Sequence, residues 1–273
     1  MKRYIKMIAL GIALVLICGL GWFANALLGN PISKMLATNT AKEHLVEVYP
    51  DTDYYIERVN YNFKDGNYYA RIKSPSSIDT EFTLYITMLG ELKLDTYEDV
   101  VNGSNTARRL DTEYRNVVEP IFTNPSFPYM LHIDYGTLEI IPSEYINEEN
   151  SHDVPKYSIP QEELVLDKIY NIQELGARAG HLVIYVDNEV VSFEEAARIM
   201  VDIKRIFDEA GVSFKAMDFN LWYPKREDGS REDGRVNVHD FMYEDIYEEG
   251  MVERVIEAHN ALEEYYAIQD SKK

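Results

Sequence analysis

His132 and Asp134 stand two residues apart in the run Tyr129 to Asp134, which has the pattern of a β-strand. Because every second side chain of a strand points to the same face, the two would present an imidazole and a carboxylate together. Such a pair could ligate a metal ion or act on a substrate, so these two residues are the catalytic candidates of the chain. The sequence supplies no third ligand at a recognisable spacing, and a hydrogen-bonded surface pair is the simpler interpretation.

Three other polar groupings invite a chemical interpretation, and each has a simpler one. His239 and Asp240 are neighbours on an expected strand, so they should point to opposite faces rather than form a dyad. His259 adjoins the apolar positions of an expected helix and is interpreted as its boundary residue. The loop DGSREDG at 228–234 lacks the alternating ligands and distal Glu of a calcium loop, and Arg231 places a cation among its acids. We therefore expect neither a metal nor a cofactor.

The sequence carries none of the common enzyme signatures. The motifs GxSxG, HExxH, GxGxxG and the phosphate-binding P-loop are missing. Cys18 is the only cysteine and lies in an apolar N-terminal run, so the remainder of the chain has no disulfide, thiol nucleophile or cysteine metal ligand. These observations leave enzymatic activity uncertain and favour a non-enzymatic role.

The chain is strongly acidic, with a formal net charge of −20. Three of its 27 basic residues precede the apolar run, which leaves 24 against 47 acidic residues in the remainder. Such a charge opposes binding to nucleic acid phosphates, so we expect no nucleic acid partner. A solvated acidic surface is the simplest account of this composition.

Residues 7–28 contain no charged side chain, and Lys2, Arg3 and Lys6 stand just before them. A helix of this length rises roughly 33 Å, which is enough to cross a hydrocarbon core of about 30 Å. The positive-inside rule would keep residues 1–6 in the cytoplasm and place the bulk of the chain on the other side. We expect a single-pass transmembrane helix in the cell membrane.

Two alternatives compete with an uncleaved anchor. Ala24-Asn25-Ala26 has the form of a signal-peptidase site, so the chain could be cleaved after Ala26 and secreted. Leu27 and Leu28 prolong the apolar run to full spanning length, which favours the anchor. Cys18 could be acylated in a lipoprotein, but Ile17 before it is a poor fit, and a buried apolar role is preferred.

The first unit, residues 31–141, reads as a helix packed on an antiparallel meander. Pro31 suits the start of a helix that runs to Val48, and Asp65-Gly66 predicts a tight hairpin between two alternating strands. The remaining expected elements are a third strand at 82–86, a polar helix at 95–118 weakened by Gly103, and strands at 129–134 and 137–141. A linker at 142–160 follows, because prolines and acidic residues gather there.

The second unit, residues 161–273, is also predicted to be α+β. The nearly continuous apolar run HLVIYVDN should form a central strand after a helix that ends before Gly180. Ser192 and Glu195 form a capping box at the start of the next helix, and Gly211 ends that helix. A strand at 212–223, a hairpin tip, a returning strand at 236–241 and a final helix at 243–268 complete the unit.

Long segments of the chain resemble a known family. The basic start and apolar span are followed by LGNPISK and by HLVEVYPDTDYYIERVNYNFKDGNYYARIKSP, and together they resemble the N-terminal domain of the YfjL-like proteins of Firmicutes. The second unit resembles the C-terminal domain of the same family in the segment GHLVIYVDNEVVSFEEAARIMVDIKRIFDEAGVSFKAMDFNLWY. This resemblance implies a membrane-anchored two-domain protein of unassigned function, and it supplies no site residues.

We therefore expect a transmembrane helix followed by two α+β domains outside the cytoplasm. The predicted role is a non-enzymatic binding, sensory or scaffolding module of the cell envelope, with an envelope protein or wall component as partner. The alternative is an envelope hydrolase or metal-assisted enzyme that uses His132, Asp134 or carboxylates of the second unit. A pocket that gathers polar side chains would favour the alternative.

Overall fold

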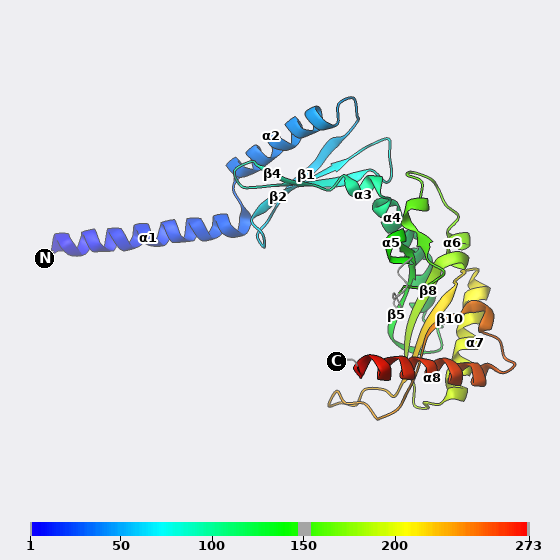
Figure 1. Ribbon diagram of the computed structural model, residues 1–273. Helices are drawn as coiled ribbons and strands as arrows, with labels where there is room; N and C mark the ends of the chain where they lie inside the picture. Colours follow the sequence, from blue (N-terminus) through cyan, green and yellow to red (C-terminus); the bar gives the residue numbers. More distant parts are fainter. Residues whose placement is uncertain (1, 147–153, 272–273) are drawn as a thin grey trace. The chain divides into compact units, whose positions relative to one another are not determined.

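The computed structural model describes residues 2–146 and 154–271, and the chain divides into two compact units, Met1–Asn105 and Thr106–Lys273 (Figure 1). Helices pack on antiparallel or mixed sheets in both units, so the α+β prediction is confirmed. The predicted boundary is wrong. The segment 106–141 belongs to the second unit, because its strand pairs there and its helix packs into that core.

The first unit begins with helix α1, Lys2–Leu28, which is long and apolar enough to cross a membrane and whose apolar window is not buried by the remainder of the protein. Tyr61 and Tyr68 fix the junction that follows it. The Tyr61 hydroxyl donates to the Ala26 carbonyl at 3.0 Å. The Tyr68 hydroxyl accepts from the Asn30 amide at 2.8 Å and donates to the Asn30 carbonyl at 2.9 Å. Gly29 stands at φ 69° directly against the Tyr68 hydroxyl, so a side chain there would have no room.

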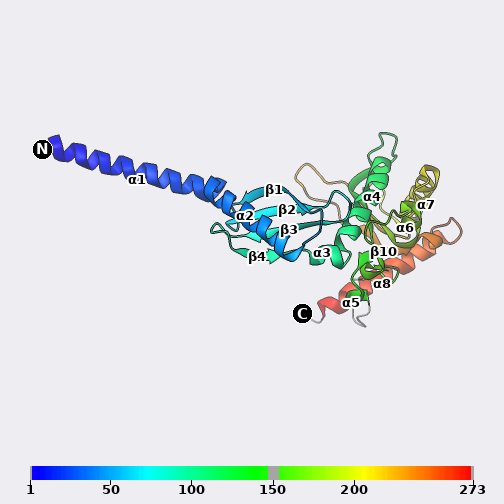
Figure 2. The same cartoon turned by 90° about the horizontal axis from the view of Figure 1, so that it is seen from above.

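The first sheet is an antiparallel meander in the order β1-β2-β3-β4, and helix α2, Pro31–Val48, packs along it (Figure 2). Asn30 caps this helix by accepting from the Ser33 amide at 2.8 Å. The predicted hairpin is confirmed, because Asn62 pairs with Asn67 around Gly66 at φ 70°. The strands are β1 Tyr55–Asn62, β2 Asn67–Lys73, β3 Glu81–Ile86 and β4 Leu92–Asp95.

The expected helix at 95–118 is in fact two helices. Gly103 adopts φ 84° and separates α3, Glu98–Val101, from α4, Ser104–Phe122. The expected linker at 142–160 is partly structured, because β7, Ile159–Pro160, pairs in parallel with β6, Ile140–Ile141, and α5, Ser143–Ile146, lies between them in sequence. Residues 147–153 of that linker lie outside the described part of the chain.

The second unit contains a four-stranded sheet in the order β10-β9-β8-β5. Strands β8 and β9 are parallel, as their connection through helix α7 requires, and the outer pairs are antiparallel. The predicted central position of β8 is confirmed. The elements are β5 Met130–Leu138, the short helix η1 Gln161–Glu163, α6 Ile172–Ala179, β8 Gly180–Asp187, α7 Phe193–Ala210, β9 Ala216–Trp222, β10 Arg235–Met242, the short helix η2 Tyr243–Asp245 and α8 Met251–Asp270.

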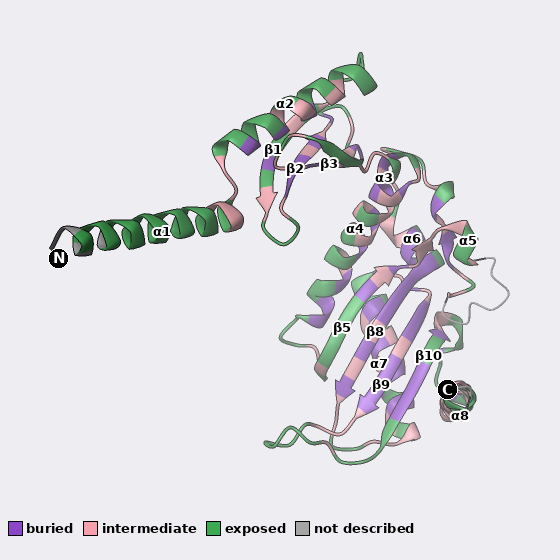
Figure 3. Ribbon diagram, turned by 60° about the vertical axis from the view of Figure 1, so that its left-hand side comes forward, coloured by how far each residue is buried: buried purple, intermediate pink, exposed green. Residues whose placement is uncertain are grey.

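One face of this sheet carries the core, and α4, α6 and α7 supply the helical side of it (Figure 3). The capping prediction for α7 is confirmed, because the Ser192 hydroxyl accepts from the Glu195 amide at 3.2 Å and Gly211 ends the helix at φ 68°. Tyr114 of α4 is fully buried and donates to the Ser213 carbonyl at 2.9 Å. Three glycines make room for its ring, namely Gly136, Gly176 and Gly180.

Candidate functional site

The face of the second sheet that turns away from the core is polar. In β8, the side chains of Leu182 and Ile184 enter the core. His181 directly precedes Leu182 in this strand, so its side chain points to the opposite face. In β9, Met217 and Phe219 enter the core, which places Asp218 on the same face as His181. Both strands are central, and half-buried polar groups on them require partners.

A β-bulge in β10 completes the grouping. Val238 pairs with Phe219 and Phe241 pairs with Met217, so His239 and Asp240 together stand opposite the single residue between them in β9. Asp240 adopts the left-handed φ of 47°, which a side-chain-bearing residue takes only at a cost. Both side chains therefore line one hollow. The expectation that they point to opposite faces is wrong, because it assumed a regular strand.

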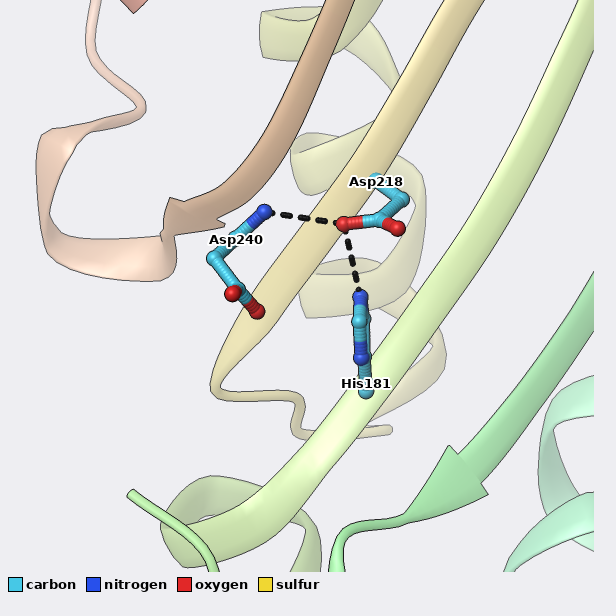
Figure 4. A group of neighbouring side chains, drawn as sticks. All are labelled: His181, Asp218 and Asp240. Atoms are coloured by element: carbon cyan, nitrogen blue, oxygen red, sulfur yellow. Dashed lines mark hydrogen bonds and ion pairs between the residues drawn. The ribbon is translucent and has the colours of Figure 1, made fainter. Parts of the chain in front are cut away.

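His181 lies between the carboxylates of Glu139 and Asp218, and Figure 4 shows its contact with Asp218. Its Nδ1 is 2.9 Å from Glu139 Oε1, and its Nε2 is 2.9 Å from Asp218 Oδ1. The first contact has hydrogen-bond geometry, whereas the second is close but poorly directed and leaves the buried Nε2 without a hydrogen bond among the described residues. The residue is only 8% exposed. Nδ1 is therefore held by a hydrogen bond, whereas Nε2 is held only by its ion pair with Asp218, which a metal ion shared by the two residues could replace.

Asp240 closes the other side of the cluster. Its backbone amide donates to Asp218 Oδ1 at 2.8 Å, and its side chain accepts from the Tyr157 hydroxyl at 2.9 Å. Ligand atoms of His181, Asp218 and Asp240 all lie within 4.8 Å of one another, which is close enough for a metal ion to contact all three after small side-chain rotations. The surrounding hollow has a volume of about 730 Å³ and is bordered by Tyr265 and Tyr266 of α8.

The cluster has more negative than positive charge. Burial alone would lower the pKa of His181, but its close contacts with Asp218 and Glu139 and the attraction of these two carboxylates outweigh burial and raise that pKa to about 10. Burial opposes ionisation of Asp218 as well, yet contact with the imidazolium brings its pKa below the ordinary value. Burial and repulsion from Asp218 raise the pKa of Asp240, against the hydrogen bond from Tyr157. Three carboxylates thus share one imidazolium, and the excess charge favours a bound cation.

The predicted pair His132 and Asp134 is not part of this cluster. In β5, Leu131 pairs with Val186 and Ile133 with Tyr185, so His132 is an extra residue that interrupts the alternation on which a shared face depended. His132 is exposed, and the pKa of Asp134 is raised by burial and by repulsion from Glu119. Their catalytic role stays a prediction.

The structure also places the other sequence candidates. His259 of α8 faces β10, with its Nδ1 3.2 Å from the backbone nitrogen of Asn237 and 3.0 Å from its carbonyl oxygen. It is a boundary residue, as predicted. In the loop at 228–234, Arg231 Nη1 lies 2.6 Å from Asp187 Oδ1, and Asp228 accepts from the Ser230 amide. The guanidinium group of Arg231 therefore supplies a positive charge at this hairpin tip from the chain itself.

His181 was missed from the sequence because HLVIYVDN reads as one buried apolar run. A signal was present in the spacing of the polar residues. His181, Tyr185 and Asp187 are separated by even numbers of residues, and so are Asp218 and Asn220 in the next strand, so each set lies on one face of its strand. Such alternation on two neighbouring central strands indicates a polar face. No pattern in the sequence indicates the β-bulge at 239–240, which brings Asp240 into the cluster with His181 and Asp218.

Two family models match the chain. The model of the YfjL-like N-terminal domain matches residues 4–97, and that of the YfjL-like C-terminal domain matches residues 113–257. The chain belongs to the YfjL-like family. The resemblance stated from the sequence is confirmed, and the interval between the two matches contains the division at 105/106. Every residue of the polar cluster lies in the YfjL-like C-terminal domain.

No curated protein matches the chain significantly. Among solved structures, the chain is similar to a DUF5037 family protein from Ruminococcus gnavus ATCC 29149, with 16% identity over 68% of this chain and 74% of that chain. The TM-score of this match is 0.20, so no feature of that protein is carried over.

Proposed function

We propose that this YfjL-like protein is a single-pass membrane protein whose C-terminal domain binds a divalent metal ion outside the cytoplasm. The observation that carries the proposal is the arrangement of His181, Asp218 and Asp240: a buried imidazole whose Nε2 has an ion pair with Asp218 but no well-directed hydrogen bond among the described residues, with the carboxylate of Asp240 beside them. In this interpretation the role is ion binding or ion sensing, without enzymatic turnover.

The donor set favours a borderline metal ion. One imidazole nitrogen with carboxylate oxygens suits Zn²⁺ or Mn²⁺, whereas Ca²⁺ prefers six or more oxygen ligands. Glu139 has the supporting position: by holding Nδ1 at 2.9 Å it orients the ring and makes Nε2 the ligand atom. Binding must displace the proton from Nε2, so a proton is released for each ion bound.

The anchor supports the cellular part of the proposal. Residues 7–28 carry no charge, helix α1 is exposed along its apolar window, and basic residues precede it. Protease added to intact cells should degrade the chain beyond Asn30, and protection of an expressed chain would reverse the proposed orientation. Recovery from the medium of a chain that begins after Ala26 would instead establish cleavage and secretion.

Calorimetry on the full chain in detergent tests the ion. Zn²⁺ should bind at one saturable site in the second unit, and Asp218→Asn or His181→Gln should abolish that binding. His44→Gln is the matched control, because His44 also contacts a carboxylate, Asp95 at 2.7 Å, but in the first unit. Absence of a saturable heat, or an equal loss in the control, would refute the proposal.

A metal-assisted hydrolase is the second candidate, because the hollow of about 730 Å³ leaves room for a substrate beside Asp240. A bound ion there could activate water while a carboxylate accepts its proton. The Zn²⁺-loaded chain would then hydrolyse nitrophenyl esters or phosphates, with activity lost in Asp218→Asn. Zn²⁺ binding without such turnover would favour the binding role.

A further inference from the structure

A second hollow lies on the same sheet face, next to the cluster of His181, Asp218 and Asp240. It has a volume of about 540 Å³, and it extends over β8, β9 and β10 to the C-terminal half of α8. His239, Tyr266 and Asp270 border both hollows, so the two hollows adjoin each other. The floor comes from the strands, and the wall comes from the helix.

Asn220 is the most informative residue of this floor. It is 3% exposed, it lies between Tyr185 and Asn237 in the strand register, and it borders the hollow. Its buried Nδ2 has no hydrogen-bond partner among the described residues. Native structures rarely leave a buried donor unpaired, so this amide requires an acceptor that the described chain does not provide.

Aromatic rings flank this amide. Trp222 and Tyr185 meet edge to face with ring centroids 5.1 Å apart, and Trp222 Nε1 donates to Asn237 Oδ1 at 3.1 Å. Across the hollow, Tyr266 of α8 is 41% exposed, and its ring meets the ring of His239 at a right angle. The aromatic rings of Trp222 and Tyr266 thus border the hollow into which Asn220 offers a donor that is unpaired among the described residues, and each ring combines an apolar face with a polar group at its edge.

The charges around the hollow select against ions. Among the described residues that border the hollow, Arg235 is the one arginine or lysine, and its Nη2 is already paired with Glu263 Oε1 at 3.2 Å; His239 and the acidic residue Asp270 border the hollow as well. The carboxylates of the neighbouring cluster repel an anion. A cationic amine, in turn, offers no acceptor to Asn220. A neutral ligand rich in hydroxyl and carbonyl oxygens satisfies both conditions.

We propose that this hollow binds a neutral saccharide chain. Asn220 Nδ2 donates to a hydroxyl or acetamide oxygen, and the C–H face of a sugar ring packs between Trp222 and Tyr266. Binding requires no metal ion, so the proposal goes beyond the ion site and does not depend on it.

Tryptophan fluorescence of the full chain in detergent provides the test. Because the sequence has only Trp22 and Trp222, a Trp22→Phe background makes Trp222 the sole reporter. With EDTA present, triacetylchitotriose or maltotriose should give a saturable change. Asn220→Leu should weaken the binding by about tenfold or more, because the hydrogen bond is lost, without lowering the melting temperature, because a buried unpaired donor is removed.

The matched control is Asn60→Leu, at an exposed position of β1 in the first unit, and its affinity should equal that of the parent. Three outcomes would overturn the proposal: no saturable change with either trisaccharide at millimolar concentration, unchanged affinity in Asn220→Leu, or tighter binding of spermidine than of both sugars. The last result would assign the hollow to a cation. Since every measurement is made in EDTA, failure here leaves the ion site to be judged by calorimetry alone.

Discussion

Replacing His181 by Asn removes the only imidazolium between Glu139 and Asp218. The two carboxylates raise the pKa of His181 from 6.5 to about 10 against the effect of burial, and each unit corresponds to about 1.4 kcal/mol. The three side chains are 10%, 18% and 19% exposed, so solvent screens this attraction only in part. We expect His181→Asn to lower the free energy of unfolding by about 3 kcal/mol at pH 7, as when one partner of a buried ion pair is removed.

The pH dependence of the parent chain has a definite sign. Because folding raises the pKa of His181, the folded state holds this proton more tightly than the unfolded state does. The stabilisation is complete below pH 6.5 and disappears as the pH rises through about 10. His181→Asn should remove this part of the pH dependence, so the stability of the variant should change less between pH 7 and 10.

Chemical denaturation of the ion-free chain, in detergent with EDTA, measures both effects. Trp222 reports the second unit, and a Trp22→Phe background removes the other tryptophan. His44→Asn is the control, because it alters a histidine–carboxylate pair in the first unit and should leave this transition unchanged. Equal stability of His181→Asn and parent, or the same decline with pH in both, would refute the electrostatic reasoning.

Three further outcomes test other parts of the second unit. Gly180→Ala would place a methyl group within 2.7 Å of the Tyr114 ring, so we expect a loss of about 2 kcal/mol in the same denaturation experiment. Ser192→Ala removes the oxygen that accepts from the Glu195 amide and should cost about 1 kcal/mol, whereas Ser192→Asp should retain the stability. Asp240→Asn keeps a residue that tolerates φ 47° but removes a repelled charge; calorimetry should show weakened Zn²⁺ binding in a chain that is no less stable, and unchanged binding would contradict the ligand assignment.

Local signals predicted individual elements well. Asp65-Gly66 specified a hairpin, and the oxygen of Ser192 with Gly211 fixed both ends of α7, because each of these signals acts within a few residues. The division of the chain was not predictable in this way. Strand β5 pairs with β8, which lies some 50 residues later in the sequence. The residues of β5 alone do not determine which of the two sheets this strand joins.

The candidate site shows the same limit. His181 and Asp218 follow from strict alternation on central strands, and a closer count of parity would have found them. Asp240 depends on a bulge that changes the register between β9 and β10, and His132 is displaced from its expected face by a bulge in β5. An inserted residue changes which side chains share a face, and the sequence does not mark where the insertion falls.

The pairing of β5 with β8 has a consequence for the order in which the chain acquires structure during synthesis. The meander of the first unit joins only sequence neighbours, so its ladders can form as soon as residue 95 is available. The later sheet must wait for β8, β9 and β10, and the apolar face of α4, which β5 already contacts, is covered in full only when α7 arrives some 70 residues behind it. The first unit has low contact order and the second unit has high contact order, so we expect the first unit to fold in a fast phase and the second unit in a slower one. Chaperone dependence and proteolytic sensitivity of nascent chains should therefore concentrate in the stretch that begins at α4.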